Sequence, residues 1–280
     1  MVDTTGVSLA IFAAFFFGTY FVPLKRSNRI NPFTYQALVG AGALVVGIIS
    51  SFLLNIHFQV NITALVPGIM WAIANFIGAN AVRYSGMSWL SIGQAAVLLV
   101  TFLWGVVFFK EPFQSLQLAI VGVLLLMLGV FLVSIGGLNT GKSRRGLVLF
   151  VIAGIIWGSI YVAPLSFEMS ARSIIPSMML GVFISGFTLF LAGRRRFEKA
   201  DVSNGVLSGM LWATGNVAAT LSIDLIGIAL AGPLPQLAML VTVAWGTFYF
   251  KEVQGKRKIM KMIAGGVMLV LGAILLAFAK

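Results

Sequence analysis

One 44-residue pattern occurs twice in this chain, first in Gly68–Glu111 and again, 141 residues later, in Gly209–Glu252. The two copies align without a gap and share 13 identical positions. These include a tryptophan, an asparagine and a terminal Lys-Glu pair, which chance matches between apolar segments do not bring into register. The chain therefore consists of two related halves, which we place at 1–136 and 146–280 with a linker at 137–145.

Apolar runs of about 20 residues recur along nearly the whole length, and each is long enough to span a hydrocarbon core. Of the 280 residues, 60% are hydrophobic and only 9% are charged, which leaves no room for a separate soluble domain. The sequence predicts an all-α integral membrane protein with ten transmembrane helices, at about 7–24, 32–54, 62–83, 87–109, 115–134, 146–165, 174–192, 204–224, 228–250 and 259–279.

Five spans in each half is an odd number, so equivalent helices cross the membrane in opposite directions and the halves form an inverted repeat. The topology also divides the 19 Lys and Arg residues, with 16 on the side opposite the N-terminus and 3 on the N-terminal side. Basic loops face the cytoplasm, so we expect both termini outside. The net charge of +12 therefore reflects membrane orientation rather than nucleic-acid binding.

The composition argues against an enzyme. There is no Cys, a single His and only seven Asp and Glu, so the clustered ligands of a membrane metalloenzyme are missing. We expect no cofactor and no metal.

Two Trp-Asn pairs are the leading candidates for substrate binding. Trp71 and Asn75 lie on one helical face, as do Trp212 and Asn216 at the equivalent positions of the second half. An amide in hydrocarbon needs a partner, so each Asn either joins two helices or faces a central pocket. Because the pairs recur, we expect one shared pocket, and an aromatic face beside an amide suits a sugar.

Two glutamines form a second candidate set. Gln94 lies in the fourth span, and Gln236 lies one residue from its equivalent, just after Pro233 and Pro235. These prolines remove backbone donors near the start of the ninth span. That pattern is typical both of the broken helices at transport sites and of a simple helix entry.

Residues at the span ends are candidates for gating. Tyr20 and Tyr161 recur near the ends of the first and sixth spans, followed by Pro23 and Pro164. We count the tyrosines among the substrate-binding candidates and the prolines among the hinge or gate residues. Interfacial anchoring explains the tyrosines equally well.

Carboxylates bear on proton coupling, and they occur only at span ends or in loops. Glu111 and Glu252 each follow a Lys, which indicates local ion pairs that keep the carboxylates charged. Asp224 continues the face of Trp212 and Asn216, and partial burial would make it the candidate proton carrier. An exposed Asp at a span end explains it as well, so transport is expected to be either uniport or proton-coupled.

Glycines at seven-residue spacing mark the fifth and tenth spans. Gly122 and Gly129 lie on one stripe of the fifth span, and Gly265 and Gly272 on one stripe of the tenth. Such stripes let helices approach closely in lipid. They suit internal packing, which we favour, or the seam of a homodimer.

The motifs resemble those of the drug/metabolite transporter superfamily. Ten spans in a five-plus-five inverted repeat and the Trp-Gly…Glu endings of the fourth and ninth spans carry that likeness. The Gly-Thr-Tyr-Phe-Val-Pro-Leu-Lys run at 18–25 and the Trp-Ala-x-x-Asn runs at 71–75 and 212–216 are similar to the glucose/ribose porter branch. The resemblance implies alternating-access transport of a sugar or similar small polar solute across the plasma membrane. It also implies a cavity lined by spans 1, 3, 4, 6, 8 and 9.

Two other functions remain as alternatives. One is an exporter of amino acids or drug-like cations, which would be expected to hold a carboxylate in its cavity. The other is a membrane assembly protein without transport activity, for which an inverted repeat has no obvious use. The expected partners are a small polar substrate and membrane lipid, with protons only if transport is coupled.

Overall fold

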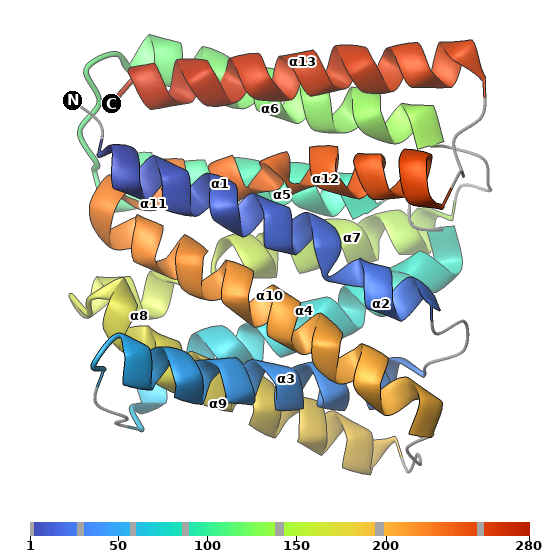
Figure 1. Cartoon of the computed structure of the whole chain (residues 1–280). Coiled ribbons are helices and arrows are strands. Elements are labelled where there is room, and N and C mark those ends of the chain that lie inside the picture. Colours follow the sequence, from blue (N-terminus) through green and yellow to red (C-terminus); the bar gives the residue numbers. More distant parts are fainter. Residues whose placement is uncertain are drawn as a thin grey trace.

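A computed structural model describes residues 3–26, 31–56, 60–85, 90–137, 143–193, 199–250 and 255–280, and the regular structure within these ranges is helical (Figure 1). In the first half the helices are α1 Thr4–Thr19, α2 Phe21–Arg26, α3 Pro32–Leu53, α4 Ile62–Ser85, α5 Leu90–Leu103, the π-helix η2 Trp104–Phe108 and α6 Leu116–Gly137. In the second half they are α7 Arg144–Gly158, α8 Val162–Ser166, α9 Ala171–Ala192, α10 Lys199–Ile226, α11 Ile228–Ala231, the 3-10 helix η3 Leu234–Leu237, α12 Ala238–Ala244, the π-helix η4 Trp245–Tyr249 and α13 Lys256–Phe278.

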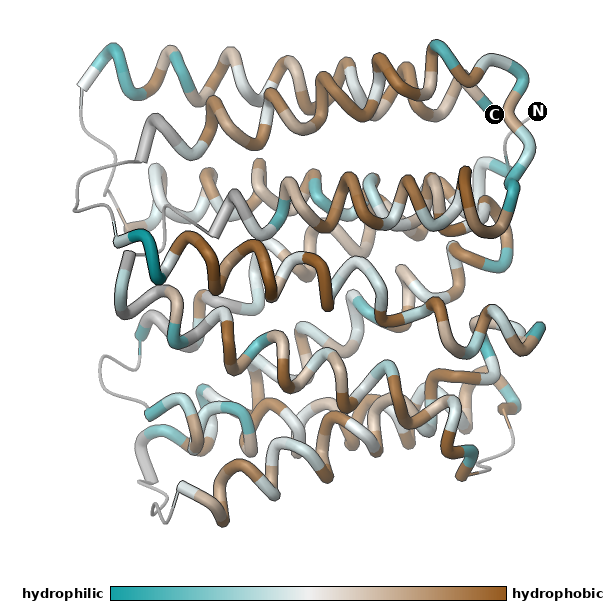
Figure 2. The backbone as a smooth tube through the Cα atoms, turned by 180° about the vertical axis from the view of Figure 1, so that it is seen from behind, coloured by the Kyte–Doolittle hydropathy of each residue, from teal (hydrophilic) through white to brown (hydrophobic). Residues whose placement is uncertain are grey.

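The outer surface is apolar, as lipid requires. Phe52 and Phe248 are more than 80% exposed, and many other large hydrophobic side chains face outward with them. Hydrophilic residues gather towards the two ends of the bundle (Figure 2). Within the described ranges, seven helical segments are long and apolar enough to cross a membrane, and three shorter apolar helices accompany them. The chain is thus an integral membrane protein, and the count of ten spans, which needs the three shorter helices, stays a prediction.

The glycine stripes of α6 and α13 pack against each other. A Cβ atom added to Gly129 would lie 2.8 Å from the carbonyl oxygen of Gly265, and one added to Gly122 would lie 2.9 Å from that of Gly272. Only glycine allows the two backbones to come this close. The internal packing favoured for the stripes thus holds at these four glycines, and a homodimer stays a prediction.

Contacts in the central bundle are reciprocal between the halves. α1 packs on α10 and α7 on α4, while α3 packs on α9. The first glycine of each repeated block marks such a contact, because a Cβ on Gly68 would collide with the Met178 carbonyl and one on Gly209 with the Val39 carbonyl. The repeated glycines therefore let each half approach the other at equivalent points.

Several predicted spans are not single α-helices. The first divides into α1 and α2, the sixth into α7 and α8, and the ninth into α11, η3, α12 and η4. Pro23 and Pro164 explain the first two breaks, since a proline lacks its N–H and its ring displaces the carbonyl four residues earlier. The start of the fourth span and most of the predicted linker lie outside the described residues.

Candidate substrate site

The repeated tryptophans meet in the buried interior, across the two halves. The ring centroids of Trp71 on α4 and Trp212 on α10 are 3.7 Å apart with an interplanar angle of 29°, which is a stacked arrangement. The two side chains are 6% and 3% exposed. Such a pair contributes about 0.5–1.5 kcal/mol beyond the burial of its surface. The stack joins the two halves at equivalent residues.

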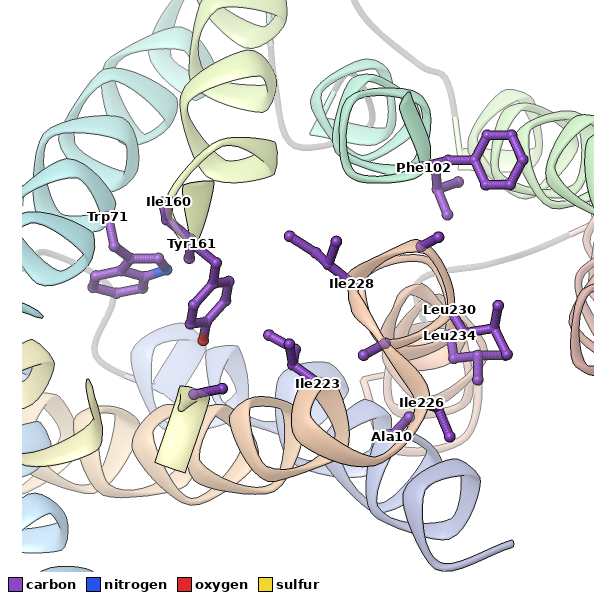
Figure 3. Close-up of a cluster of buried hydrophobic side chains, with 14 of the residues drawn as sticks. Ala10, Trp71, Phe102, Ile160, Tyr161, Ile223, Ile226, Ile228, Leu230 and Leu234 are labelled. Atoms are coloured by element: carbon purple, nitrogen blue, oxygen red, sulfur yellow. The ribbon is translucent and has the colours of Figure 1, made fainter. Parts of the chain in front are cut away.

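Asn216 belongs to a polar cluster with Tyr161 and Thr220, which we call the hydroxyl cluster. Asn216 Nδ2 donates to the Tyr161 hydroxyl at 3.2 Å, and that hydroxyl lies 2.7 Å from Thr220 Oγ1. Asn216 and Thr220 lie one turn apart on α10, and all three side chains are buried. In Figure 3 Trp71 and Tyr161 belong to one buried cluster, and the Tyr161 hydroxyl points towards α10, the helix that carries Ile223. Tyr161 thus contacts the predicted Asn216, and its role in substrate binding stays a prediction.

Asn75 has a different partner. Its Nδ2 donates to Gln36 Oε1 on α3 at 2.6 Å, and we call these two residues the amide cluster. Asn75 is 5% and Gln36 1% exposed, yet Gln36 Nε2 has no hydrogen-bond partner among the described residues. A buried donor left unpaired is rare and calls for an explanation. Sequence reasoning missed Gln36, because the second half has no amide at the equivalent position.

The two clusters lie on opposite sides of the Trp stack. α4 and α10 run in opposite directions along the bundle (Figure 1), and each Asn follows its Trp by four residues, or about 6 Å along the helix. Asn75 and Asn216 are therefore displaced from the stack towards opposite ends. Each has its own partners, so the single pocket expected for both is better described as two clusters with aromatic rings between them.

The glutamine candidates lie apart from these clusters. Gln94 on α5 has a buried Oε1 that finds no partner in the described part of the chain, and Gln236 is half-buried in η3. The helix is broken where Pro233 and Pro235 predicted it, because α11 ends before these prolines and η3 begins only at the residue between them. Within the described part of the chain, no hydrogen bond joins either glutamine to the amide or hydroxyl cluster.

The hinge candidates lie where the helices divide. Tyr20, which is half-buried, separates α1 from α2, and Tyr161 directly precedes α8. Pro23 and Pro164 are both buried in the second, short helix of each pair. These positions are consistent with hinges, and their role in gating stays a prediction.

Asp224 does not occupy the partly buried position expected of a proton carrier. Its side chain is exposed, and its carboxylate accepts from the backbone N–H groups of Ala171 at 2.7 Å and Arg172 at 2.9 Å. Ser170 Oγ donates to it as well, at 3.0 Å. A carboxylate is favoured at this position because the first N–H groups of a helix lack internal partners. Asp224 therefore caps α9, because α10 ends beside the start of that helix.

Glu111 forms its ion pair with Lys280 rather than with the adjacent Lys110. Lys280 Nζ donates to Glu111 Oε2 at 2.8 Å, and Glu111 Oε1 accepts from the backbone N–H of Ile228 at 2.7 Å. Lys110 is exposed. The expected local pair is therefore wrong for this half, because the chain turns at Lys110, with φ of 51°, and carries Glu111 inward. Glu252 lies outside the described residues.

The chain was compared with known proteins. A family model described as "Sugar transport protein" matches residues 9–279. The glucose uptake protein GlcU of Bacillus subtilis is 23% identical over 97% of this chain and 98% of its own length. A putative sugar uptake protein of Listeria innocua is 27% identical over 98% of this chain and 99% of its own.

A solved structure extends the likeness to the fold. One crystal structure of a protein has a TM-score of 0.77, covers 98% of this chain and 96% of its own, and shares 15% sequence identity. At that identity the likeness concerns the fold alone. The family match spans nearly all the described helices, and it agrees with the predicted transporter rather than an enzyme. The chain is a multi-pass membrane protein that belongs to the sugar transport protein family.

Proposed function

We propose that this protein carries a sugar or a similar small, neutral, polar metabolite across the plasma membrane by alternating access. The carrier has ten spans in two inverted repeats, at 1–136 and 146–280, with the linker at 137–145. Family membership and the printed functions of the relatives support transport of a sugar. The reciprocal packing of the halves supports the repeat.

The observation that carries the proposal is a stacked aromatic pair flanked by neutral hydrogen-bonding groups. Trp71 and Trp212 offer flat apolar faces to the C–H groups of a sugar, while Asn75, Asn216 and Gln36 supply donors and acceptors for its hydroxyls. Both clusters consist of amides and hydroxyls, so they suit an uncharged solute. An amino acid or a cation would leave its charge without a counterion there.

The free Nε2 of Gln36 supports a ligand at the amide cluster. A buried donor without a partner costs about 1–3 kcal/mol, and a substrate hydroxyl placed there would satisfy it. Among the described carboxylates, Glu111 and Asp224 are occupied in holding helix ends, so we assign the proton-carrying role to neither.

Substitution of each Asn tests the site. Asn75→Leu and Asn216→Leu should lower sugar uptake into proteoliposomes by about 5- to 150-fold, which corresponds to about 1–3 kcal/mol for a group left unpaired. Asn80→Leu is the matched control, because Asn80 is also on α4 but donates to the carbonyl of Phe76 in its own helix. The control should transport normally.

Normal uptake in both Asn75→Leu and Asn216→Leu would show that these residues only join helices. Stabilisation of the parent protein by amino acids or cationic drugs, and not by sugars, would favour the exporter. Absence of transport for every solute class tested would favour an assembly protein.

The orientation has its own test. The 16-to-3 division of basic residues favours both termini outside. The native chain has no Cys, so Thr4→Cys and Ser143→Cys introduce single labelling sites. An impermeant maleimide added to intact cells should label position 4 and spare position 143. The reverse pattern would invert the topology.

A further inference from the structure

Two tryptophans outside the Trp stack make matching hydrogen bonds between the halves. Trp104 Nε1 donates to Ser159 Oγ at 2.9 Å, and Trp245 Nε1 donates to Thr19 Oγ1 at 3.2 Å. The two tryptophans are equivalent under the shift of 141 residues. In each bond, the indole of one half binds a hydroxyl of the other half.

Every partner lies where the backbone leaves the α-helical form. Trp104 begins η2 and Trp245 begins η4, and π-helical turns of this kind are rare and often found at functional sites. Thr19 is the last residue of α1, and Ser159 follows the last residue of α7. The prolines of α2 and α8 create these breaks, so both hydroxyls sit beside a point where the helix can bend.

The Thr19 hydroxyl is oriented to accept a hydrogen bond from the Trp245 indole. It donates its own proton to the Phe15 carbonyl at 2.7 Å, which leaves its lone pairs for the Trp245 indole. Both bonds join neutral, partly buried groups, so breaking one strands no buried charge. Such a bond can stabilise a closed state and still break reversibly.

The two bonds lie at opposite ends of the molecule. α8, next to Ser159, is at the end where α1 begins, and α2, next to Thr19, is at the other end (Figure 1). The hydroxyl cluster includes Tyr161, which is two residues after Ser159. This cluster therefore lies on the Ser159 side of the Trp stack. The amide cluster lies on the other side. Each end of the proposed substrate site is therefore bordered by one Trp–hydroxyl bond.

We propose that the Trp104–Ser159 and Trp245–Thr19 hydrogen bonds each keep one end of the substrate site closed, and that each must break when its end opens. We call these two bonds the latches. This inference rests on the proposed alternating access. It adds the residues that hold each end shut, and it predicts that one latch can be weakened while the other is unaffected.

Two equivalent buried positions serve as reporters. Val97 on α5 is 9% exposed and Ala238 on α12 is 5% exposed. A Cβ added to Gly158 would lie 3.3 Å from the Val97 carbonyl, and one added to Gly18 would lie 2.5 Å from the Ala238 carbonyl. Each reporter thus touches the helix that carries the latch hydroxyl. Because the chain has no Cys, Val97→Cys and Ala238→Cys give single labelling sites.

The latches are opened one at a time by Trp104→Phe and Trp245→Phe, which keep an aromatic ring but lose the donor. In sealed vesicles of each orientation, without sugar, Trp104→Phe should raise maleimide labelling of position 97 from the end where α1 begins. The expected increase is about fivefold, which corresponds to about 1 kcal/mol. Labelling of position 238 from the opposite end should not change, and Trp245→Phe should give the reverse.

Removal of the acceptors provides the matched control. Ser159→Ala should reproduce the effect of Trp104→Phe, Thr19→Ala that of Trp245→Phe, and each double variant should add nothing to its single variants. If either Phe variant exposes both reporters equally, or neither reporter, the bonds are ordinary packing contacts and the proposal is wrong. Labelling needs no substrate, so side-specific labelling without sugar uptake would contradict the proposed substrate and leave the latches intact.

Discussion

The two halves place an asparagine at the same position of the repeat but give it different partners. Asn216 binds the hydroxyl of Tyr161, which also contacts Thr220, whereas the partner of Asn75 among the described residues is the amide of Gln36. The position equivalent to Thr220 is Ala79, which has no hydroxyl. Duplication thus kept the framework of Trp and Asn while the neighbours diverged. A sugar is itself asymmetric, so the proposed site, with two amides on one side and an amide with two hydroxyls on the other, would bind it in one orientation.

The largest expected difference between the halves concerns stability. Asn75→Leu leaves both Oε1 and Nε2 of the buried Gln36 side chain unpaired. It should destabilise the protein by about 1–3 kcal/mol. Asn216→Leu should cost less, because the Tyr161 hydroxyl and Thr220 keep their 2.7 Å contact. Thermal unfolding in detergent measures both changes.

A second substitution sharpens this comparison. Adding Gln36→Leu to Asn75→Leu should recover most of the lost stability, since replacing both members of a buried polar pair by apolar groups is nearly neutral. Sugar uptake should stay low in the double variant. If stability does not recover, the cost of Asn75→Leu arises from packing rather than from the stranded amide.

The contribution of the hydroxyl cluster is expected to be intermediate. Tyr161→Phe removes the contacts to Asn216 and Thr220 and should cost about 1 kcal/mol, with a fall of several-fold in uptake. Tyr84→Phe is the control, because Tyr84 is 53% exposed on α4. Equal effects of the two variants on unfolding temperature and uptake would remove Tyr161 from the site.

The smallest expected effect lies at the helix ends. Asp224→Asn keeps an oxygen that can accept from Ala171 N–H but loses the charge at the start of α9, so it should destabilise by about 0.3–1 kcal/mol. Transport driven by a pH gradient and counterflow should change together. Loss of gradient-driven accumulation with counterflow intact would instead make Asp224 the proton carrier and overturn its assignment as a cap.

Much of the candidate site was predicted from polar side chains in apolar helices, because such side chains need hydrogen-bonding partners in hydrocarbon. Asn75, Asn216 and their tryptophans were predicted because polar and aromatic residues recur at one register in both halves. Gln36 was missed because it has no repeated counterpart, and Ser177 occupies the equivalent position. Without recurrence, a single amide in an apolar helix does not reveal which neighbouring helix holds its partner.

The sequence by itself determined the membrane class, the duplication and the breaks at the prolines, since each follows from local chemistry: apolar length, register and the missing N–H of proline. Only the tertiary structure decided which distant residues meet. The stacking of Trp71 on Trp212, the capping of α9 by Asp224 and the pairing of Glu111 with Lys280 join residues more than 50 positions apart. Such partners depend on how helices pack and cross, and helix packing is set by the whole surface of each helix rather than by any one motif.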